Sequence, residues 1–376
     1  MILLEDYFIP TESHLYSLLH DSSLGKSIFQ YDNNQSYIDN SNLAIIGFSN
    51  DFINDDYSVS NSIRQHLYSL ESYYNNVKII DLGNFRNGKT INDTHIGIRD
   101  VIIYLYEKNI IPIIIGGNQN GIYGIYLAFD KIQKFVNIAS IESKIHIADN
   151  DEYKQSYLSK IIDSGSKYLF NYTNIGYQSY IQSQKSLEEL SNYYFDYFRL
   201  GLVRSNIKEI EPILRDAELI NFSFNTIKSS DARLSLFSSP NGFSGDEACQ
   251  IAKYSGLSDK LLAYSLFDLI GNNTDNSQTY ILAAQMIWYF IEGISQKQVE
   301  YPTTDNSNYK KFIVHINNEY NVVFFKSLKT DRWWFEIPYQ KIKDRNLIVS
   351  CSYNDYLKAC NHELPDKWWL TYQKIN

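Results

Sequence analysis

The sequence contains few cysteines, and their spacing is not that of a metal-binding motif. Its 376 residues include three, Cys249, Cys351 and Cys360. An odd number of cysteines with no C-x-x-C pair argues against a cysteine-based metal site. We therefore expect reduced thiols in a cytoplasmic protein.

The chain also lacks an excess of basic residues, a basic leader and long apolar runs. Its 34 Lys and Arg against 43 Asp and Glu give a formal net charge of −9, with no basic patch in the sequence, which argues against a nucleic acid as the main partner. The first nine residues contain Glu5 and Asp6 and no basic segment, which argues against a signal peptide. No run approaches the roughly 20 apolar residues that cross a bilayer, so we expect a soluble protein with no membrane partner.

Short apolar runs are what the chain has instead. They are separated by amphipathic stretches, such as residues 62–73 and 95–108, which are typical of helices. Continuous Ile- and Val-rich runs favour strands buried on both faces, and their alternation with helices predicts a mostly parallel sheet. We expect a three-layer α/β/α sandwich over residues 43–300, preceded by a helical extension over residues 1–42. The runs are residues 43–48, 77–82, 111–115, 136–141, 168–176, 219–224 and 261–267.

The composition changes after residue 300, so residues 301–376 are predicted to form a small α+β appendage. Residues 311–315 and 322–326 flank a polar stretch and indicate a hairpin. Two tryptophan pairs follow, Trp333-Trp334 and Trp368-Trp369. They suit either an interface with a protein partner or packing of the appendage onto the main domain.

Polar side chains follow three of the apolar runs directly. Gly116-Gly117-Asn118-Gln119 follows the run at residues 111–115, and Glu142-Ser143-Lys144-Ile145-His146 follows the run at residues 136–141. Asn225-Thr226-Ile227 follows the run at residues 219–224. In parallel α/β sheets the site lies at the carboxyl ends of the strands, so these groups are expected to meet there. If the second strand continued, Glu142, Lys144 and His146 would share one face, because strand side chains alternate.

These landmarks, with residues 239–247 and 278–293, resemble in order and spacing the arginase, agmatinase and formimidoylglutamase family, the ureohydrolases. The resemblance covers roughly residues 43–293. It implies an arginase-like fold, a homo-oligomer and a dinuclear manganese site that hydrolyses C–N bonds in linear amidines. Two bridged cations lower the pKa of a shared water and so supply hydroxide at neutral pH.

The resemblance also assigns the metal-ligand positions, and most of them are altered. They fall on Gln119, Glu142, Lys144, His146, Asn225 and Ile227. Of these, Glu142 and His146 are competent ligands, the two amides are weak, Ile227 has no donor atom and Lys144 is a cation. We therefore expect no cofactor, and manganese only if Glu142 and His146 hold it with further groups. Lys144 could instead replace a metal charge by pairing with Glu142, or point into solvent.

Two acidic residues could still bind a ligand in this pocket. The family's substrate-contacting glutamate corresponds to Asp268, whose alternative role is to cap the following turn. Asp149 lies in the acidic stretch after His146. The preferred interpretation is a ureohydrolase-like protein that has lost hydrolysis and acts through binding or assembly. The alternatives are an active metal-dependent amidine hydrolase, and a non-catalytic sensor that recognises a cationic amine through Glu142, Asp268 and Asp149.

Overall fold

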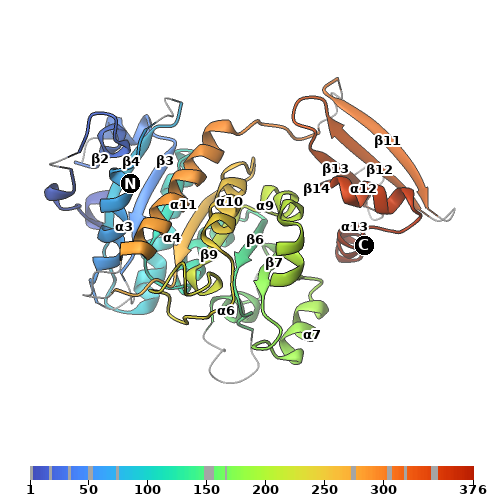
Figure 1. Ribbon diagram of the computed structural model, residues 1–376, viewed down its shortest axis with the longest axis horizontal. Coiled ribbons are helices and arrows are strands. Elements are labelled where there is room, and N and C mark those ends of the chain that lie inside the picture. The colour runs from blue at the N-terminus through green and yellow to red at the C-terminus, as the bar shows by residue number, and fades with distance from the viewer. Residues whose placement is uncertain are drawn as a thin grey trace.

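The apolar runs of the sequence form the central sheet of the computed structural model (Figure 1). The structure describes all residues except 1–2, 17–18, 33–34, 50–53, 73–75, 148–155, 166, 272–276, 303–306, 317–319 and 340–345. Its 10-stranded sheet has the order β1-β4-β3-β5-β10-β9-β6-β7-β8, and β2 also pairs with β4. Neighbouring strands are parallel except β1 and β4. The strands are β1 (Phe8–Ile9), β2 (Phe29–Gln30), β3 (Leu43–Gly47), β4 (Ile79–Phe85), β5 (Ile111–Ile115), β6 (Val136–Ile141), β7 (Leu169–Tyr177), β8 (Asp196–Arg199), β9 (Leu219–Ser223) and β10 (Ala263–Phe267).

Helices cover both faces of this sheet, which makes the domain the predicted three-layer sandwich. Successive strand side chains point to opposite faces, so even an all-apolar strand supplies two cores. Leu43 and Ile45 belong to the buried cluster that includes side chains of α3, α10 and α11, whereas Ala44 and Ile46 belong to the one that includes side chains of α4, α5 and α6. The helices of this domain are α1 (Leu24–Ser27), α2 (Gln35–Asp39), α3 (Ser58–Tyr68), α4 (Ile91–Glu107), α5 (Gly121–Lys131), α6 (Tyr157–Asp163), α7 (Gln184–Asn192), α8 (Leu200–Ser205), α9 (Glu211–Arg215), α10 (Gly245–Gly256) and α11 (Ser277–Gln296).

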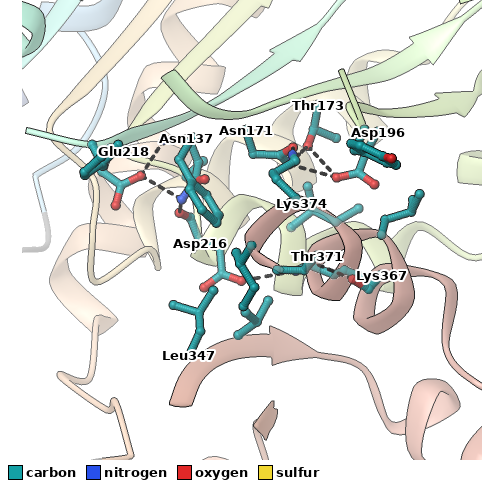
Figure 2. Close-up of a pocket in the computed structure, with 18 of the residues that line it drawn as sticks. Asn137, Asn171, Thr173, Asp196, Asp216, Glu218, Leu347, Lys367, Thr371 and Lys374 are labelled. Carbon is teal, nitrogen blue, oxygen red and sulfur yellow. Dashed lines mark hydrogen bonds and ion pairs between the residues drawn. The ribbon is translucent and has the colours of Figure 1, made fainter. Parts of the chain in front are cut away.

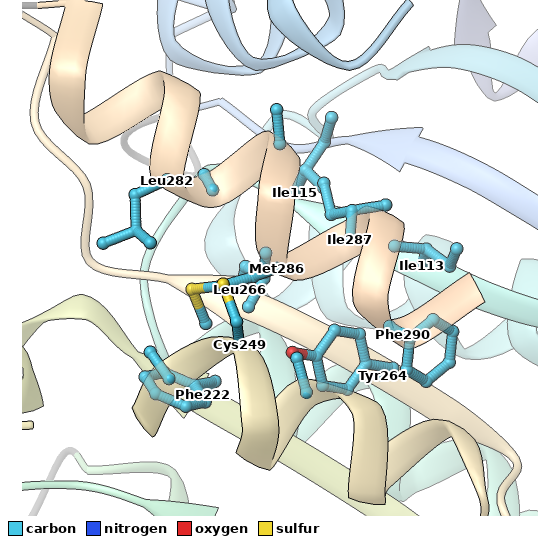
Figure 3. Close-up of a cluster of buried hydrophobic side chains, with 14 of the residues drawn as sticks. Ile113, Ile115, Phe222, Cys249, Tyr264, Leu266, Leu282, Met286, Ile287 and Phe290 are labelled. Carbon is cyan, nitrogen blue, oxygen red and sulfur yellow. The ribbon is translucent and has the colours of Figure 1, made fainter. Parts of the chain in front are cut away.

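Helices α10 and α11 pack closely on each other and on the sheet (Figure 3). The rings of Tyr264 and Phe290 stack with their centroids 4.3 Å apart. A Cβ atom on Gly256 would lie 2.2 Å from the Phe290 carbonyl oxygen, and one on Gly293 would lie 2.3 Å from the Lys253 carbonyl oxygen. From the sequence, residues 280–291 are expected to form a long helix that Gly293 stops, and the position of this stop is wrong. The helix continues to Gln296, and Gly293 allows the backbones of the two helices to approach.

Each apolar run marked in the sequence contains a strand, but three strands are additional. Strand β8 has the sequence DYFR and lies partly exposed at the sheet edge, so it lacks the apolar run of a central strand. Strands β1 and β2, two residues each, lie in the segment expected to be helical and pair with β4. That segment therefore extends the sheet as well as supplying short helices.

The C-terminal unit has its own antiparallel sheet of four strands, β11-β12-β13-β14, with two helices beside it (Figure 1). The predicted hairpin is confirmed, because β11 and β12 pair in register from Tyr309 with Ser327 to Ile316 with Tyr320. The elements are β11 (Tyr309–Ile316), β12 (Tyr320–Ser327), β13 (Trp333–Pro338), β14 (Asn346–Cys351), α12 (Tyr353–Cys360) and α13 (Asp366–Ile375). No helix in the described part of the chain is both long and apolar enough to span a bilayer.

The tryptophans of this unit pack inside the chain. Trp334 is 1% exposed, and the Arg215 guanidinium from the main domain lies 4.5 Å from its ring centroid. Trp333 and Trp368 belong to the core of the unit, and Trp369 packs against it partly buried. Trp334 thus packs against the main domain, as the packing alternative expects, whereas the other three tryptophans pack within the C-terminal unit itself.

A carboxylate of the main domain joins the two units beside these tryptophans. Asp216 accepts hydrogen bonds from the backbone N–H of Ser350 at 2.9 Å and from its hydroxyl at 2.8 Å. It also forms ion pairs with Lys367 of α13 at 3.1 Å and with Lys260 at 3.0 Å. Burial alone would raise the pKa of Asp216, but the two lysine charges outweigh burial and hold it well below its usual range.

Candidate functional site

The turn after β5 brings the first predicted site residue to the edge of the sheet. Gly116 and Gly117 have φ of +77° and +76°, a left-handed conformation that glycine adopts without a steric penalty. A Cβ on Gly116 would also lie 2.4 Å from the Ser60 hydroxyl oxygen. The two glycines direct Gln119 towards the ends of the neighbouring strands, ahead of α5.

Asp268 gathers three donors at the end of β10. Its side chain is buried, and its φ of +68° is uncommon for a residue with a Cβ. One carboxylate oxygen, Oδ2, accepts hydrogen bonds from Ser223 Oγ at 2.5 Å, Gln119 Nε2 at 2.6 Å and Asn225 Nδ2 at 3.3 Å. The amides at two predicted metal positions are therefore donors to Asp268, and burial raises the pKa of this carboxyl.

Glu142 is the second buried carboxyl of the site. It is 1% exposed, and its Oε1 accepts hydrogen bonds from Tyr157 Oη at 2.8 Å and Asn221 Nδ2 at 3.0 Å. Its other oxygen, Oε2, is buried and has no hydrogen-bond donor among the described residues. Burial raises the pKa of Glu142 to about 8; the hydrogen bond from Tyr157 opposes this rise, and the nearby charge of Asp268 adds to it.

Lys144 and His146 line the same cavity, but not for the reason that the sequence suggests. Strand β6 ends at Ile141, so residues 142–147 are irregular and strand alternation does not apply to them. Burial, with a smaller contribution from the positive charge of Lys144, lowers the pKa of His146 to about 4. Within the described part of the chain, Lys144 forms no ion pair with Glu142, whose hydrogen bonds come from Tyr157 and Asn221.

Ile227 is separated from this group. A turn of 3-10 helix, Phe224–Thr226, interrupts the chain after β9 and turns the Ile227 side chain into the main core, where it is fully buried. Asp149 lies outside the described residues. The remaining predicted residues meet in one cavity of about 800 Å³, which Gln119, Glu142, Lys144, His146, Asn225 and Asp268 all line.

Sequence reasoning did not single out Tyr157, Asn221 and Ser223. A signal exists for the last two, because they are polar residues in the otherwise apolar strand β9 and lie two positions apart on one face. Both are nearly completely buried, and buried polar groups need a partner. Tyr157 begins α6 and has no comparable local signal.

Among the described residues, the side chains at the expected ligand positions differ from the usual ligands of the two manganese ions that the resemblance implies. Such ions prefer carboxylate and imidazole ligands. The donor set instead contains amide groups that donate to Asp268, a lysine and a core isoleucine. The described residues include no cluster of three or more His, Cys, Asp or Glu side chains placed to hold a metal.

Solved structures, and not sequences, are what this chain matches. No protein-family model and no curated protein matches the chain. The fold is similar to formimidoylglutamase from Bacillus subtilis, with a TM-score of 0.63, 16% identity, and coverage of 76% of this chain and 96% of that one. Formiminoglutamase from Trypanosoma cruzi, solved with Mn²⁺, is similar with a TM-score of 0.60 and 15% identity, and the match covers 69% of this chain and 95% of that one. Agmatine ureohydrolase of Thermoplasma volcanium is similar with a TM-score of 0.57 and 19% identity, and the match covers 75% of this chain and 97% of that one. The expected arginase-like fold is confirmed.

Proposed function

We propose that this chain, built on the ureohydrolase fold, has lost dinuclear manganese hydrolysis and binds a small cationic ligand at the carboxyl edge of its sheet. One observation carries the proposal. Gln119 and Asn225, at positions where the resemblance expects metal ligands, direct their amide N–H groups at Asp268. A neutral amide binds a metal ion through its oxygen, and Asn225 Oδ1 already accepts a hydrogen bond from the backbone N–H of Phe237 at 2.8 Å.

The ligand is inferred from Glu142. Its Oε2 has no donor among the described residues, although the cavity of about 800 Å³ reaches this side chain. An unsatisfied buried acceptor costs about 1–3 kcal/mol, and a ligand ammonium or amidinium would remove that cost through a charge-assisted hydrogen bond. A cationic ligand therefore fits the free oxygen, and Asp268 adds negative charge to the same cavity.

The loss of hydrolysis is tested by metal content. The purified chain is incubated with excess manganese, desalted and analysed, and assayed for hydrolysis of formimidoylglutamate, agmatine and arginine. We expect metal near zero and no product. About two equivalents of manganese per chain, or product from any of the three substrates, would overturn the proposal in favour of an active amidine hydrolase.

Ligand binding is tested by thermal stabilisation with agmatine and arginine at pH 8.5, because a ligand that binds only the folded chain raises its melting temperature. We expect saturable stabilisation without turnover, and its loss in Glu142→Gln. Glu188→Gln, on the exposed face of α7, is the matched control and should behave as wild type. Equal stabilisation of the Glu142→Gln variant would contradict the role of Glu142.

A further inference from the structure

A second cavity lies at the opposite, amino-terminal edge of the same strands (Figure 2). Its volume of about 720 Å³ falls within the range of small-molecule sites, roughly 300–1,000 Å³. One wall comes from the starts of β6, β7, β8 and β9, and the other from β14 and α13 of the C-terminal unit. No residue of this cavity belongs to the site described above.

One wall carries a carboxylate without a cationic partner. Glu218, directly before β9, accepts hydrogen bonds through Oε2 from the backbone N–H of Asn137 at 2.7 Å and from Asn137 Nδ2 at 2.9 Å. Among the described residues, its other oxygen has no hydrogen-bond donor, and no Lys, Arg or His lies within 4.0 Å of the carboxylate. Lys260, the cation that acts most strongly on Glu218, is paired with Asp216. Glu218 can therefore receive a further cation.

The other wall carries a cation without an anionic partner. Lys374 of α13 donates a hydrogen bond to Asn171 Oδ1 and lies 5.6 Å and 5.2 Å from the ring centroids of Phe170 and Phe195. No carboxylate of the described chain lies within 4.0 Å of its ammonium. Figure 2 shows Glu218 with Asn137 at one side of the cavity and Lys374 with Asn171 at the other.

The two charges lie about two strand spacings apart. The Glu218 carboxylate lies between its own chain segment before β9 and Asn137 of β6, whereas Lys374 lies beside Asn171 of β7, which bonds Asp196 of β8. Two spacings amount to roughly 10 Å. The side chains of Phe135, Phe170, Leu347 and Leu370 line the cavity and supply apolar surface for the body of a ligand.

We propose that this cavity binds a small zwitterion whose ammonium and carboxylate are joined by an apolar spacer, with the ammonium at Glu218 and the carboxylate at Lys374. An α-amino acid carries its charges on one carbon atom and is too short to reach both. A linear ω-amino acid or a dipeptide is long enough. Each charge of such a ligand would supply the counter-charge for one of these two buried groups.

The environment of both groups agrees with this assignment. Burial raises the pKa of Glu218 to about 7, where Lys260 and Lys134 oppose the rise and Asp216 adds to it. Burial lowers the pKa of Lys374 to about 8, opposed by Asp196. Both shifts are those of buried charges that lack a counter-ion. Glu218 is ionised above about pH 7 and Lys374 is protonated below about pH 8, so zwitterion binding should be strongest between these values.

The proposal is tested by calorimetric titration of the full chain at pH 7.5 with 6-aminohexanoate, hexylamine, hexanoate and glycine. We expect saturable binding of 6-aminohexanoate, at least ~10-fold tighter than either singly charged analogue, and no binding of glycine. Bound 6-aminohexanoate should also slow hydrogen exchange in α13, because the ligand joins α13 to the strands. No saturable binding at millimolar concentration, or equal affinity for hexylamine, would overturn the proposal.

Variants assign the binding to this cavity. Glu218→Gln and Lys374→Met should each weaken the binding of 6-aminohexanoate by ~10-fold or more. The first substitution retains an acceptor for the hydrogen bond from Asn137, and the second retains the apolar stem of the side chain. Glu188→Gln and Lys358→Met, both exposed, are the controls and should bind as wild type. Unchanged affinity in both cavity variants, or affinity that rises or falls steadily from pH 6 to 9 instead of passing through a maximum, would contradict the assignment.

Discussion

Glu142 is protonated in the folded chain over a pH range in which it is ionised in the unfolded chain. Burial raises the pKa of Glu142 from an ordinary value of 4.5 to about 8. Between these values the folded chain holds a proton that the unfolded chain has released. By linkage, the free energy of unfolding falls as the pH rises from about 4.5 to about 8.

Glu142→Gln should remove this pH dependence, because glutamine resembles the protonated acid. We expect similar stability of variant and wild type near pH 4.5, and a variant more stable by roughly 2–4 kcal/mol at pH 9. Urea unfolding of both proteins at each pH measures the difference. Glu188→Gln corrects for loss of a surface charge, and a difference that stays constant with pH would contradict the burial argument.

The site shows how far residues can be placed from sequence. Gln119, Glu142 and Asn225 were expected to meet, and they do, because the ends of parallel strands share an edge. The hydrogen bonds of Gln119 and Asn225 were not predictable, because they depend on the left-handed turn at Asp268, which is about 150 residues from Gln119 in the sequence. Ile227 was assigned to the site from the resemblance alone, and the 3-10 turn before it turns its side chain into the core instead.

At the scale of elements, the contact between α10 and α11 depends on two glycines. The Cβ of an alanine at position 256 would meet the Phe290 carbonyl oxygen at 2.2 Å, so the helices would have to separate. Gly256→Ala should therefore lower the free energy of unfolding by about 1–3 kcal/mol, the usual cost of overpacking. Chemical denaturation of the variant and the wild type measures this change in the free energy of unfolding.

Gly201→Ala is the matched control for this substitution. Gly201 lies in α8 with open space where the Cβ would be, so alanine should stabilise the chain by about 0.5–1 kcal/mol through its higher helix propensity. The two substitutions have the same chemistry and opposite expected signs. Equal effects would show that helix propensity, and not the helix contact, governs both positions.

The strands were predictable where burial on both faces produced a continuous apolar run. Strand β8 was not, because an edge strand needs fewer apolar residues, and β1 and β2 were too short to carry a pattern. The role of Gly293 was misassigned because glycine serves both as a helix end and as a point of close helix contact. Only the position of the second helix distinguishes these uses.

At the scale of the whole molecule, Asp216 holds the C-terminal unit on the main domain. Because its pKa is lowered, its contribution to stability is present above the unfolded pKa and is lost as the pH falls below about 3.8. The connection should therefore be constant from pH 5 to 9. Its partners on the C-terminal unit are Ser350 and Lys367.

Asp216→Asn should loosen this connection, because Lys260 and Lys367 would lose a buried counter-charge, at a cost of about 3–5 kcal/mol. We expect faster hydrogen exchange in β14 and α13 and unchanged exchange in β5. Asp366→Asn is the control, since its pair with Lys358 is exposed and contributes little. Uniform acceleration across all strands would indicate general destabilisation instead of loss of the domain contact.

The two cavities occupy opposite ends of the same strands. Strand β9 runs from beside Glu218 to Ser223, and β6 runs from beside Asn137 to Glu142, with five residues of β9 fully buried between the ends, ~17 Å of chain. The buried strands thus separate the two cavities, so a substitution in one cavity need not alter the other. The two cavities can therefore evolve independently, and a change of function in one leaves the other free to keep or to acquire a different function.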